Sequence, residues 1–407
     1  MKQYFKNLKE NTPPWLYNVM RRLYRMGVIR TGANAATTYK ETFKPYVVRI
    51  AQPLKVNREK VLHVIGNFWT GGSARLVVDL IEHLGHCYEQ EVITRDLPPE
   101  PAYTNMTIVL CEETDSIDSI LVQLNRLQPA LVHVHYLGHE RDEWGAMDRK
   151  WYGNIFNAIE QYGCPVIENI NIPTKPYLSN QVTKYVYVSK YVMEEYGTPN
   201  HRHTVIYPGS DFTRFSRVDH QDIPDGCIGM VYRLERDKIN EHAIDVFIDV
   251  IRRRKGTKAL IVGGGNLMIH FQNAVAKAGL TRSFIFTGYV AYERLPEYYK
   301  MLSIFVAPVH RESFGQVTPF AMHMGIPVTG YAVGALPEIV NNNDMLAPPG
   351  NYKKLSDIIC RLLDNREQRL RIGAANYLRA KQLFSVQAMI KAYERVYDDA
   401  LTGIPQG

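Results

Sequence analysis

Short apolar runs alternate with segments of helical periodicity along most of this chain. Runs rich in valine and isoleucine are typical of strands that are buried on both faces of a sheet. The predicted strands are residues 61–65, 91–94, 107–110, 131–135, 165–167, 185–188, 228–231, 259–262, 284–286 and 304–307. Because helical segments separate these runs, the pattern predicts parallel sheets with helices on both faces.

The pattern restarts after Pro208-Gly209, which predicts two α/β domains in tandem. We expect an N-terminal extension over 1–57, a Rossmann-like domain over 58–208 and a second one over 209–385. A closing helix and tail over 386–407 should return towards the first domain. Ligands of open parallel sheets bind at the carboxyl ends of the strands, so two such sheets facing each other predict a site in the cleft between them.

The composition is that of an ordinary globular protein, with 45% hydrophobic and 22% charged residues in 407. There is no apolar run long enough to span a bilayer and no signal-peptide pattern at Met1, so we expect a cytoplasmic protein. The five cysteines form no C-x-x-C pair, and no Asp-x-Asp motif is found. We expect neither a disulfide framework nor a structural zinc site, and no cofactor.

The positive charge is concentrated near the N-terminus, where residues 1–60 contain thirteen Lys or Arg against three acids. Thr12-Pro13 reads as the start of a basic amphipathic helix, with Trp15 and Tyr17 beside its apolar stripe. This helix either packs on the body of the protein or lies on an anionic membrane surface. No nucleic-acid-binding module is recognisable, so nucleic acid is not an expected partner.

Several loops that follow predicted strands contain groups suited to anions. Gly71, Gly72 and Ser73 open a helix after the first strand, and glycines let backbone amides approach a phosphate closely. Arg233 and Lys238 occupy the equivalent place in the second domain. Two cations there would neutralise a diphosphate. A plain turn or a solvated charged loop is the alternative interpretation in each case.

The most informative segment is 304–340. A buried strand leads into a loop with Glu312 and Gly315, then a helix expected from about 316 to 324, then a second strand near Gly334 and Glu338. Amides at a helix start beside a carboxylate suit a ligand that has both phosphates and sugar hydroxyls. We therefore expect a nucleotide sugar as the ligand.

Two histidines share one face of the strand at 131–135. His135, at the strand end, could meet an acceptor hydroxyl or a phosphate, whereas His133 is expected to be a core histidine. Gly263 begins a triple-glycine turn that resembles a nucleotide contact but lacks the spacing of a dinucleotide fingerprint.

Taken together, these motifs resemble the retaining glycosyltransferases of family 4, which have the GT-B fold. The resemblance runs from about Val61 to Tyr397 and is specific because the motifs occur in order. They are Gly71-Gly-Ser-Ala-Arg75, the strand ending in His135, and the segments 205–211, 231–238, 286–290, 308–315, 325–328 and 334–338.

The resemblance implies a role for each matching residue. Arg233 and Lys238 would bind the donor diphosphate, and Glu312 would hold the donor sugar with the amides of Ser313, Phe314 and Gly315. The remaining donor contacts would come from Gly71, Gly72, Gly263, Val290, Gln316, Val317, Phe320 and Glu338. His135, Ser73 and Asn171 would bind the acceptor, a glycan or lipid-linked molecule. Together, Arg233, Lys238, Glu312 and His135 form the expected catalytic set.

Two positions depart from the family pattern. Phe320 stands where the family usually has a second glutamate for the ribose hydroxyls. One hypothesis is a deoxyribose donor such as a dTDP-sugar, and the alternative is a shifted residue such as Glu338. Asn171 stands where a histidine is common, so acceptor recognition should be unusual.

The resemblance implies metal-independent, front-side transfer with retention, because no carboxylate pair suited to double displacement is evident. The donor would be a nucleotide-diphosphate sugar. The alternatives are a nucleotide-sugar 2-epimerase, which needs no acceptor, and a noncatalytic nucleotide-sugar-binding protein. Slow donor hydrolysis or transfer would argue against the noncatalytic binder.

Overall fold

The computed structural model describes residues 58–69, 71–98, 103, 105–112, 116–138, 142–198, 202–218 and 225–403. The basic helix expected after Thr12 lies outside these residues, so its packing or membrane contact stays a prediction. Among the described helices, none combines the length and the apolar character needed to span a bilayer.

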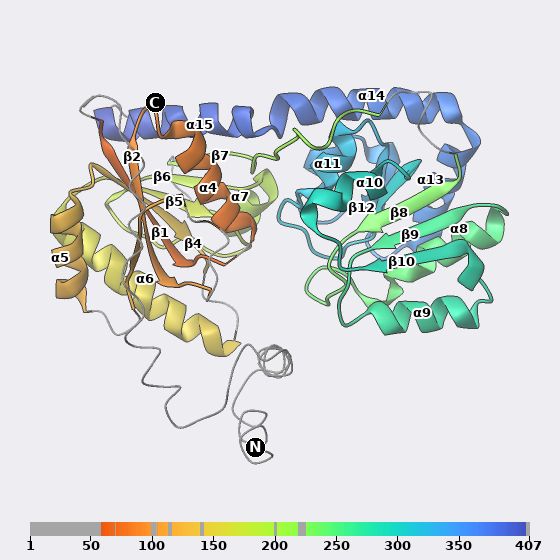
Figure 1. The fold of residues 1–407 in the computed structure, drawn as a ribbon, viewed down its shortest axis with the longest axis horizontal. Coiled ribbons are helices and arrows are strands. Elements are labelled where there is room, and N and C mark those ends of the chain that lie inside the picture. The colour runs from red at the N-terminus through yellow and green to blue at the C-terminus, as the bar shows by residue number, and fades with distance from the viewer. Residues whose placement is uncertain are drawn as a thin grey trace, which may run out of the picture. The chain divides into compact units, whose positions relative to one another are not determined.

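The first half of the described chain forms a parallel sheet of seven strands in the order β3-β2-β1-β4-β5-β6-β7 (Figure 1). The strands are β1 (Lys60–Asn67), β2 (Glu89–Asp96), β3 (Ile108–Leu110), β4 (Leu131–Tyr136), β5 (Val166–Ile170), β6 (Val182–Tyr187) and β7 (His203–Val205). All except β7 coincide with predicted runs. β7 has three half-buried residues and no apolar run, which explains why it was missed.

The second half forms a parallel sheet of six strands in the order β10-β9-β8-β11-β12-β13. These are β8 (Cys227–Val231), β9 (Lys258–Val262), β10 (Phe284–Gly288), β11 (Ile304–Ala307), β12 (Val328–Tyr331) and β13 (Leu346–Ala347). The strand expected near Gly334 and Glu338 lies earlier, at β12, and those two residues fall in the loop and helix that follow it. The two parallel sheets confirm the predicted fold class.

Helices connect the strands of both sheets. In the first half they are α4 (Gly72–Leu84), α5 (Ile117–Leu127), α6 (Asp142–Tyr162) and α7 (Lys190–Tyr196). In the second half they are α8 (Asp245–Arg253), α9 (Met268–Lys277), α10 (Leu295–Tyr299), α11 (Val317–His323), α12 (Leu336–Val340), α13 (Tyr352–Asp364), α14 (Arg366–Leu383) and α15 (Val386–Thr402). Short 3-10 turns occur at η1 (Glu241–Ile244), η2 (Thr281–Ser283), η3 (Tyr292–Arg294) and η4 (Asn343–Met345).

The two faces of the first sheet belong to different helices because successive strand side chains point to opposite sides. Leu62 and Val64 of β1 pack with residues of α5 and α6, whereas Val61 packs with residues of α4 and α15. α15 therefore covers the first sheet although it ends the chain, as the blue helix beside α4 in Figure 1 shows.

The chain passes between the two sheets twice, and the two passages are hydrogen-bonded to each other. The Ser210 amide donates to the carbonyl of Phe384 at 2.8 Å, and the Val386 amide donates to the carbonyl of Ser210 at 3.3 Å. The side chain of Ser385 then accepts from Ala388 N–H and caps α15. The domain boundaries expected at 57, 208 and 385 stay predictions.

Both sheets have the same strand order, in which the order reverses between two central strands. The reversal lies between β1 and β4 in the first sheet and between β8 and β11 in the second. The loops that leave such a strand pair run to opposite sides and open a crevice where ligands bind. This topology predicts that the residues after β1, β4, β8 and β11 matter most for ligand binding.

Three histidines on β1 and β4 are fully buried beneath α15. The imidazoles of His63 and His135 are 3.2 Å apart at Nδ1 and Nε2, and His133 Nδ1 lies 2.8 Å from the hydroxyl of Tyr397. His63 Nε2 also lies 2.9 Å from Gln90 Oε1. The prediction that His133 is a core histidine is confirmed.

The buried histidines should make the protein sensitive to acid. Burial lowers the pKa of His63 from 6.5 to about 4. Between these values the unfolded chain binds a proton that the folded chain excludes, so stability is complete above pH 6.5 and falls towards pH 4. His63 alone should remove on the order of 3 kcal/mol of unfolding free energy over that interval.

Thermal unfolding of wild type, His63→Asn and His242→Asn between pH 7 and pH 4.5 checks this. His63→Asn should lose less stability on acidification than wild type, and His242→Asn, at an exposed position, should follow wild type. Equal acid sensitivity in all three proteins would contradict the role given to His63.

Candidate functional site

Lys238 and Glu312 form an ion pair at the reversal point of the second sheet. Lys238 follows β8 and Glu312 follows β11, and Lys238 Nζ lies 2.6 Å from Glu312 Oε1. The Glu312 side chain is only 1% exposed and that of Lys238 is 31% exposed. The His310 amide also donates to the carbonyl of Lys238 at 3.1 Å, so the two loops are joined by backbone as well as side chain.

The second carboxylate oxygen of Glu312 is buried and has no hydrogen-bond partner among the described residues. Leaving a buried polar oxygen unpaired is unfavourable. A ligand hydroxyl is a suitable donor to it, because a hydroxyl donates one hydrogen bond and can be placed beside the lysine. The site thus has an unfilled acceptor next to a partly exposed cation.

Two glycines are required for the position of Glu312. Gly315 has φ +74° and Gly334 has φ +53°, both in the left-handed region that favours glycine. A Cβ at Gly315 would overlap the Glu312 carboxylate, and one at Gly334 would overlap the Glu312 carbonyl. Ala335 N–H donates to that carbonyl at 2.9 Å and closes the loop after β12 over it.

Arg233 lies on the same loop as Lys238 but is not joined to Glu312. Its Nη2 lies 2.8 Å from Asp237 Oδ2, and the side chain is 62% exposed. An exposed pair of this kind contributes little stability, so the guanidinium is free to re-pair with a stronger anion such as a diphosphate.

Side-chain packing and a hydrogen bond orient the segment after Glu312. The Phe314 ring is buried and stacks 5.7 Å from Tyr207, and Gln316 Nε2 donates to the Gly209 carbonyl at 2.9 Å. Val317 begins α11, close to the predicted helix start. Contact of a ligand with the backbone amides of Ser313, Phe314 and Gly315 stays a prediction.

The loops after β9 and β10 meet beside this site. Gly263 N–H donates to the Gly288 carbonyl at 3.1 Å, and Val290 packs on the core of the second domain. The adjacent Tyr289 is 73% exposed, with its ring against Gly264. Sequence reasoning missed Tyr289. The available signal was an aromatic residue directly after the glycine that ends a strand.

Phe320 is not a surface contact for a ligand, which corrects the prediction. It is 5% exposed, stacks on Phe215 at 4.0 Å and contacts Tyr292 edge-on. The ring faces the core because α11 presents this position to other aromatic side chains. The glutamate usual in the family is thus replaced by part of an aromatic cluster.

Glu338 also differs from the prediction. One of its carboxylate oxygens accepts from Lys190 N–H and the other from Tyr191 N–H, both at 3.0 Å, and the hydroxyl of Tyr207 donates to it at 2.9 Å. These amides belong to the start of α7 beside the first sheet. Since three donors already occupy the carboxylate, Glu338 does not stand in for the missing ribose-binding glutamate.

In the first domain, α4 begins at Gly72 with Gly71 as its N-cap residue. Both glycines are exposed, no side chain caps the helix, and its first turn contains no acid. Ser73 is half-buried in that turn. The amides at this helix start are therefore open to an anion.

His135 is buried in this structure, and Asn171 is half-buried. His135 is fully buried in the histidine cluster, and its carbonyl accepts from the Tyr152 hydroxyl at 2.6 Å. The Asn171 carbonyl oxygen accepts from the Asn169 amide group, and Asn169 in turn accepts from Tyr393 of α15. Alternating strand geometry turned His135 towards α15, so the prediction of a side chain open to the acceptor is wrong for this conformation.

Two groups of described residues have the spacing of metal ligands. They are the buried cluster His63, His133 and His135 and the α4 group Asp79, Glu82 and His83. In the first, His63 and His133 already use one nitrogen each with Gln90 and Tyr397. In the second, Asp79 pairs with Arg75 at 2.5 Å. Neither group lies with Lys238 and Glu312.

The family-model match lies in the second domain. Residues 217–379 match the family model described as glycosyl transferases group 1. This segment contains Arg233, Lys238, Glu312, Phe320 and Glu338.

Among curated relatives, a 2-deoxystreptamine glucosyltransferase of Streptomyces kanamyceticus is 32% identical over 140 residues, which is 34% of this chain and 36% of that protein. A lipopolysaccharide core biosynthesis mannosyltransferase of Rhizobium meliloti is 27% identical over 43% of this chain and 51% of its own length. The chain thus spans about half or less of the length of these relatives.

The solved structures are similar over more of the chain. HepE of Anabaena, crystallised in complex with UDP, has a TM-score of 0.69 at 16% identity over 84% of this chain and 100% of that one. Sucrose-phosphate synthase of Thermosynechococcus elongatus has a TM-score of 0.66 at 17% identity over 85% and 100%. Two Rossmann-like sheets with these neighbours define the GT-B class. Over residues 217–379, the chain is similar to the glycosyl transferases of group 1.

The glycines around Glu312 generate a prediction with a matched control. Gly334→Ala should lower the melting temperature by several degrees more than a control substitution, because the new Cβ displaces the Glu312 backbone. Gly350→Ala is the control, since Gly350 also has positive φ (+74°) but its Cβ would meet no atom. Both variants carry backbone strain of roughly 1–2 kcal/mol.

Thermal unfolding of wild type and of both variants measures the effect. Gly350→Ala should lose only the stability that the backbone strain costs. Equal melting temperatures of Gly334→Ala and Gly350→Ala would contradict the close packing of Gly334 against the Glu312 backbone.

Proposed function

We propose that this protein is a retaining, metal-independent glycosyltransferase that moves a sugar from a nucleotide-diphosphate sugar to an acceptor hydroxyl. The observation that supports this most is the Lys238–Glu312 pair at the reversal point of the second sheet. Its cation suits a phosphate, and its unpaired carboxylate oxygen suits a sugar hydroxyl. The match of residues 217–379 to glycosyl transferases group 1 also supports sugar transfer.

In this proposal Lys238 and Arg233 bind the donor diphosphate. Negative charge grows on the leaving diphosphate as the glycosidic bond breaks, and preorganised cations stabilise it. Lys238 is already held by Glu312, whereas Arg233 leaves Asp237 to join it. Glu312 orients the sugar through Oε2, with the amides of Ser313, Phe314 and Gly315 beside it.

The acceptor attacks from the face on which the diphosphate leaves. The leaving oxygen takes the acceptor proton, so configuration is retained without a second carboxylate. The open amides of Gly71 and Gly72 at the start of α4 would bind phosphate or acceptor from the first domain. Ser73 would contact the acceptor, and His135 and Asn171 would do so only after rearrangement of the first domain.

The nucleotide would contact the loops after β9 and β10. The exposed ring of Tyr289, held against Gly264, would stack on the base, with Gly263 and Val290 contributing backbone contacts. Because Phe320 is buried and Glu338 is occupied, neither supplies a carboxylate to a ribose diol. This arrangement supports a deoxyribose donor such as a dTDP-sugar.

The acceptor would be a glycan or a lipid-linked saccharide handled in the cytoplasm. One relative above is named as a lipopolysaccharide core biosynthesis mannosyltransferase, and this supports polysaccharide biosynthesis as the process we propose. Contact of the basic segment 1–57 with an anionic membrane surface would bring the enzyme to a lipid-linked acceptor.

Removal of either proposed diphosphate ligand should slow transfer. Lys238→Ala and Arg233→Ala should each lower turnover by one to three orders of magnitude, the effect of losing one preorganised charge contact. Arg236→Ala is the control, because Arg236 lies on the same loop but pairs with Glu241 at 2.9 Å. Release of nucleoside diphosphate from a panel of nucleotide sugars measures the rate, and wild-type turnover in Lys238→Ala would refute the assignment.

The buried Phe320 generates a prediction about the donor. Calorimetry should show that dTDP-glucose binds more tightly than UDP-glucose, by about tenfold if one hydroxyl is left without a partner. Tyr289→Ala should weaken both ligands equally, because stacking does not distinguish the ribose. Tighter binding of UDP-glucose than of dTDP-glucose would remove the deoxyribose hypothesis.

A further inference from the structure

A cavity of about 420 Å³ lies in the first domain, away from the loops described above. It is bordered by the last turns of α6, by the loop that enters β6, and by Arg202 just before β7. These segments lie at the amino ends of β6 and β7, whereas Gly71, His135 and Asn171 lie at the carboxyl ends of strands of the same sheet. The cavity is therefore separate from the proposed reaction site.

One wall of the cavity is a rigid aromatic surface. Tyr177 stacks on Phe156 with centroids 4.1 Å apart and planes 3° apart, and Phe156 is 2% exposed. The Tyr177 amide donates to Glu168 Oε1 at 2.8 Å, and the Tyr185 hydroxyl contacts the Tyr177 carbonyl at 3.4 Å. Both sides of the Tyr177 peptide are thus fixed, and the ring needs no ordering when a ligand arrives.

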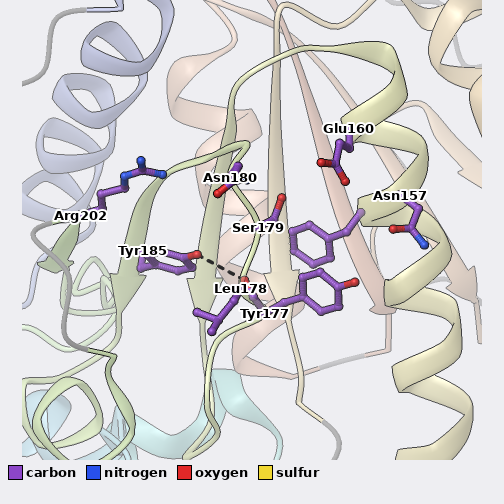
Figure 2. A pocket seen from close by; sticks show the side chains of 9 residues that line it. Asn157, Glu160, Tyr177, Leu178, Ser179, Asn180, Tyr185 and Arg202 are labelled. Atoms are coloured by element: carbon purple, nitrogen blue, oxygen red, sulfur yellow. Dashed lines mark hydrogen bonds between the residues drawn. The ribbon is translucent and has the colours of Figure 1, made fainter.

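The polar groups around this surface are of mixed type. Figure 2 shows Asn157 and Glu160 extending from α6 on one side, Arg202 on the other, and Ser179 and Asn180 between them. Arg202 Nη1 donates to the Val182 carbonyl at 2.8 Å, which holds the guanidinium at the rim.

The side chains of Asn157, Glu160 and Asn180 form no hydrogen bond with another described residue. A carboxylate, two amides, a hydroxyl and a guanidinium together offer both acceptors and donors, which is what a ligand with many hydroxyls requires.

The charge of the lining narrows the ligand class. Glu160 and Arg202 balance each other, so the cavity lacks the surplus of cations that a phosphate or a nucleotide requires. An acyl chain would require a largely apolar lining, which this cavity does not have. An aromatic wall with a carboxylate and amides suits the apolar face and the hydroxyls of an uncharged sugar ring. The volume is within the range of roughly 300–1,000 Å³ typical of small-ligand sites.

We propose that this cavity is a second saccharide-binding site, which holds a sugar unit of the acceptor glycan distant from the hydroxyl that is glycosylated. The assignment of this sugar unit to the acceptor rests on the proposed function. Saccharide binding in the cavity itself can be measured without sugar transfer. The ring lies on Tyr177, Glu160 accepts from two neighbouring hydroxyls, and Asn157 completes the contacts. Binding at two separated points raises the effective concentration of a long acceptor at the reaction site.

The test uses the full chain and a panel of methyl glycosides and disaccharides of glucose, galactose, mannose and N-acetylglucosamine. Saturation-transfer NMR finds the binders, and titration gives their dissociation constants. Glu160→Gln and Asn157→Ala should each weaken a binder by roughly tenfold, the effect of one lost hydrogen bond to a charged or buried partner. Glu194→Gln, an exposed glutamate of α7 outside the cavity, should bind as wild type does.

The variant Lys238→Ala distinguishes saccharide binding in the cavity from turnover at the proposed reaction site. It should bind the saccharide like wild type even though its turnover of a nucleotide sugar is strongly reduced. The cavity proposal is overturned if no member of the panel binds, or if a binder has the same affinity for wild type, Glu160→Gln and Asn157→Ala. Binding that is lost only in Lys238→Ala would assign the saccharide to the reaction site and also overturn it.

Discussion

The ion pair between the partly exposed Lys238 and the buried Glu312 is the interaction on which the proposed site depends. A carboxylate with a side chain only 1% exposed loses most of its hydration, and a single lysine compensates for that loss only in part. Buried pairs of this kind are weak evidence for stability, because apolar residues of similar size would often serve as well. Because this pair lies where a parallel sheet opens a crevice, we propose that it binds charged and hydroxyl-bearing groups.

The surrounding backbone explains how the pair is kept in place. The loops after β8, β11 and β12 are tied by the bonds from His310 to Lys238 and from Ala335 to Glu312. Gly315 and Gly334 leave room that any side chain would fill. Glu338 then connects the helix that follows to the amides at the start of α7, which links the second sheet to an element of the first. The loops after β8, β11 and β12, the cation and the contact with the first sheet thus form one connected arrangement.

The local sequence predicts most of the strands, but it predicts fewer of the contacts in the candidate site. Valine-rich runs located ten strands because such runs suit burial on both faces of a parallel sheet. β7 and β13 were missed because they have three and two residues and too little apolar pattern. The pairing of Lys238 with Glu312 was foreseeable, since both follow the strands at which the order reverses.

The errors concern residues whose direction is set by distant segments. His135 is turned inward because α15, more than two hundred residues later, covers its strand face. Phe320 is buried because Phe215 and Tyr292 surround it, and Glu338 is occupied because α7 presents free amides to it. No local pattern reports such contacts.

A crystal structure of the protein with a bound nucleoside diphosphate tests the central claim most directly. The account expects phosphate oxygens within hydrogen-bond distance of Lys238 Nζ and of the Arg233 guanidinium, with Arg233 released from Asp237 and Lys238 still paired with Glu312. A diphosphate bound away from the loops that follow β8 and β11, with the Arg233–Asp237 pair intact, would contradict it.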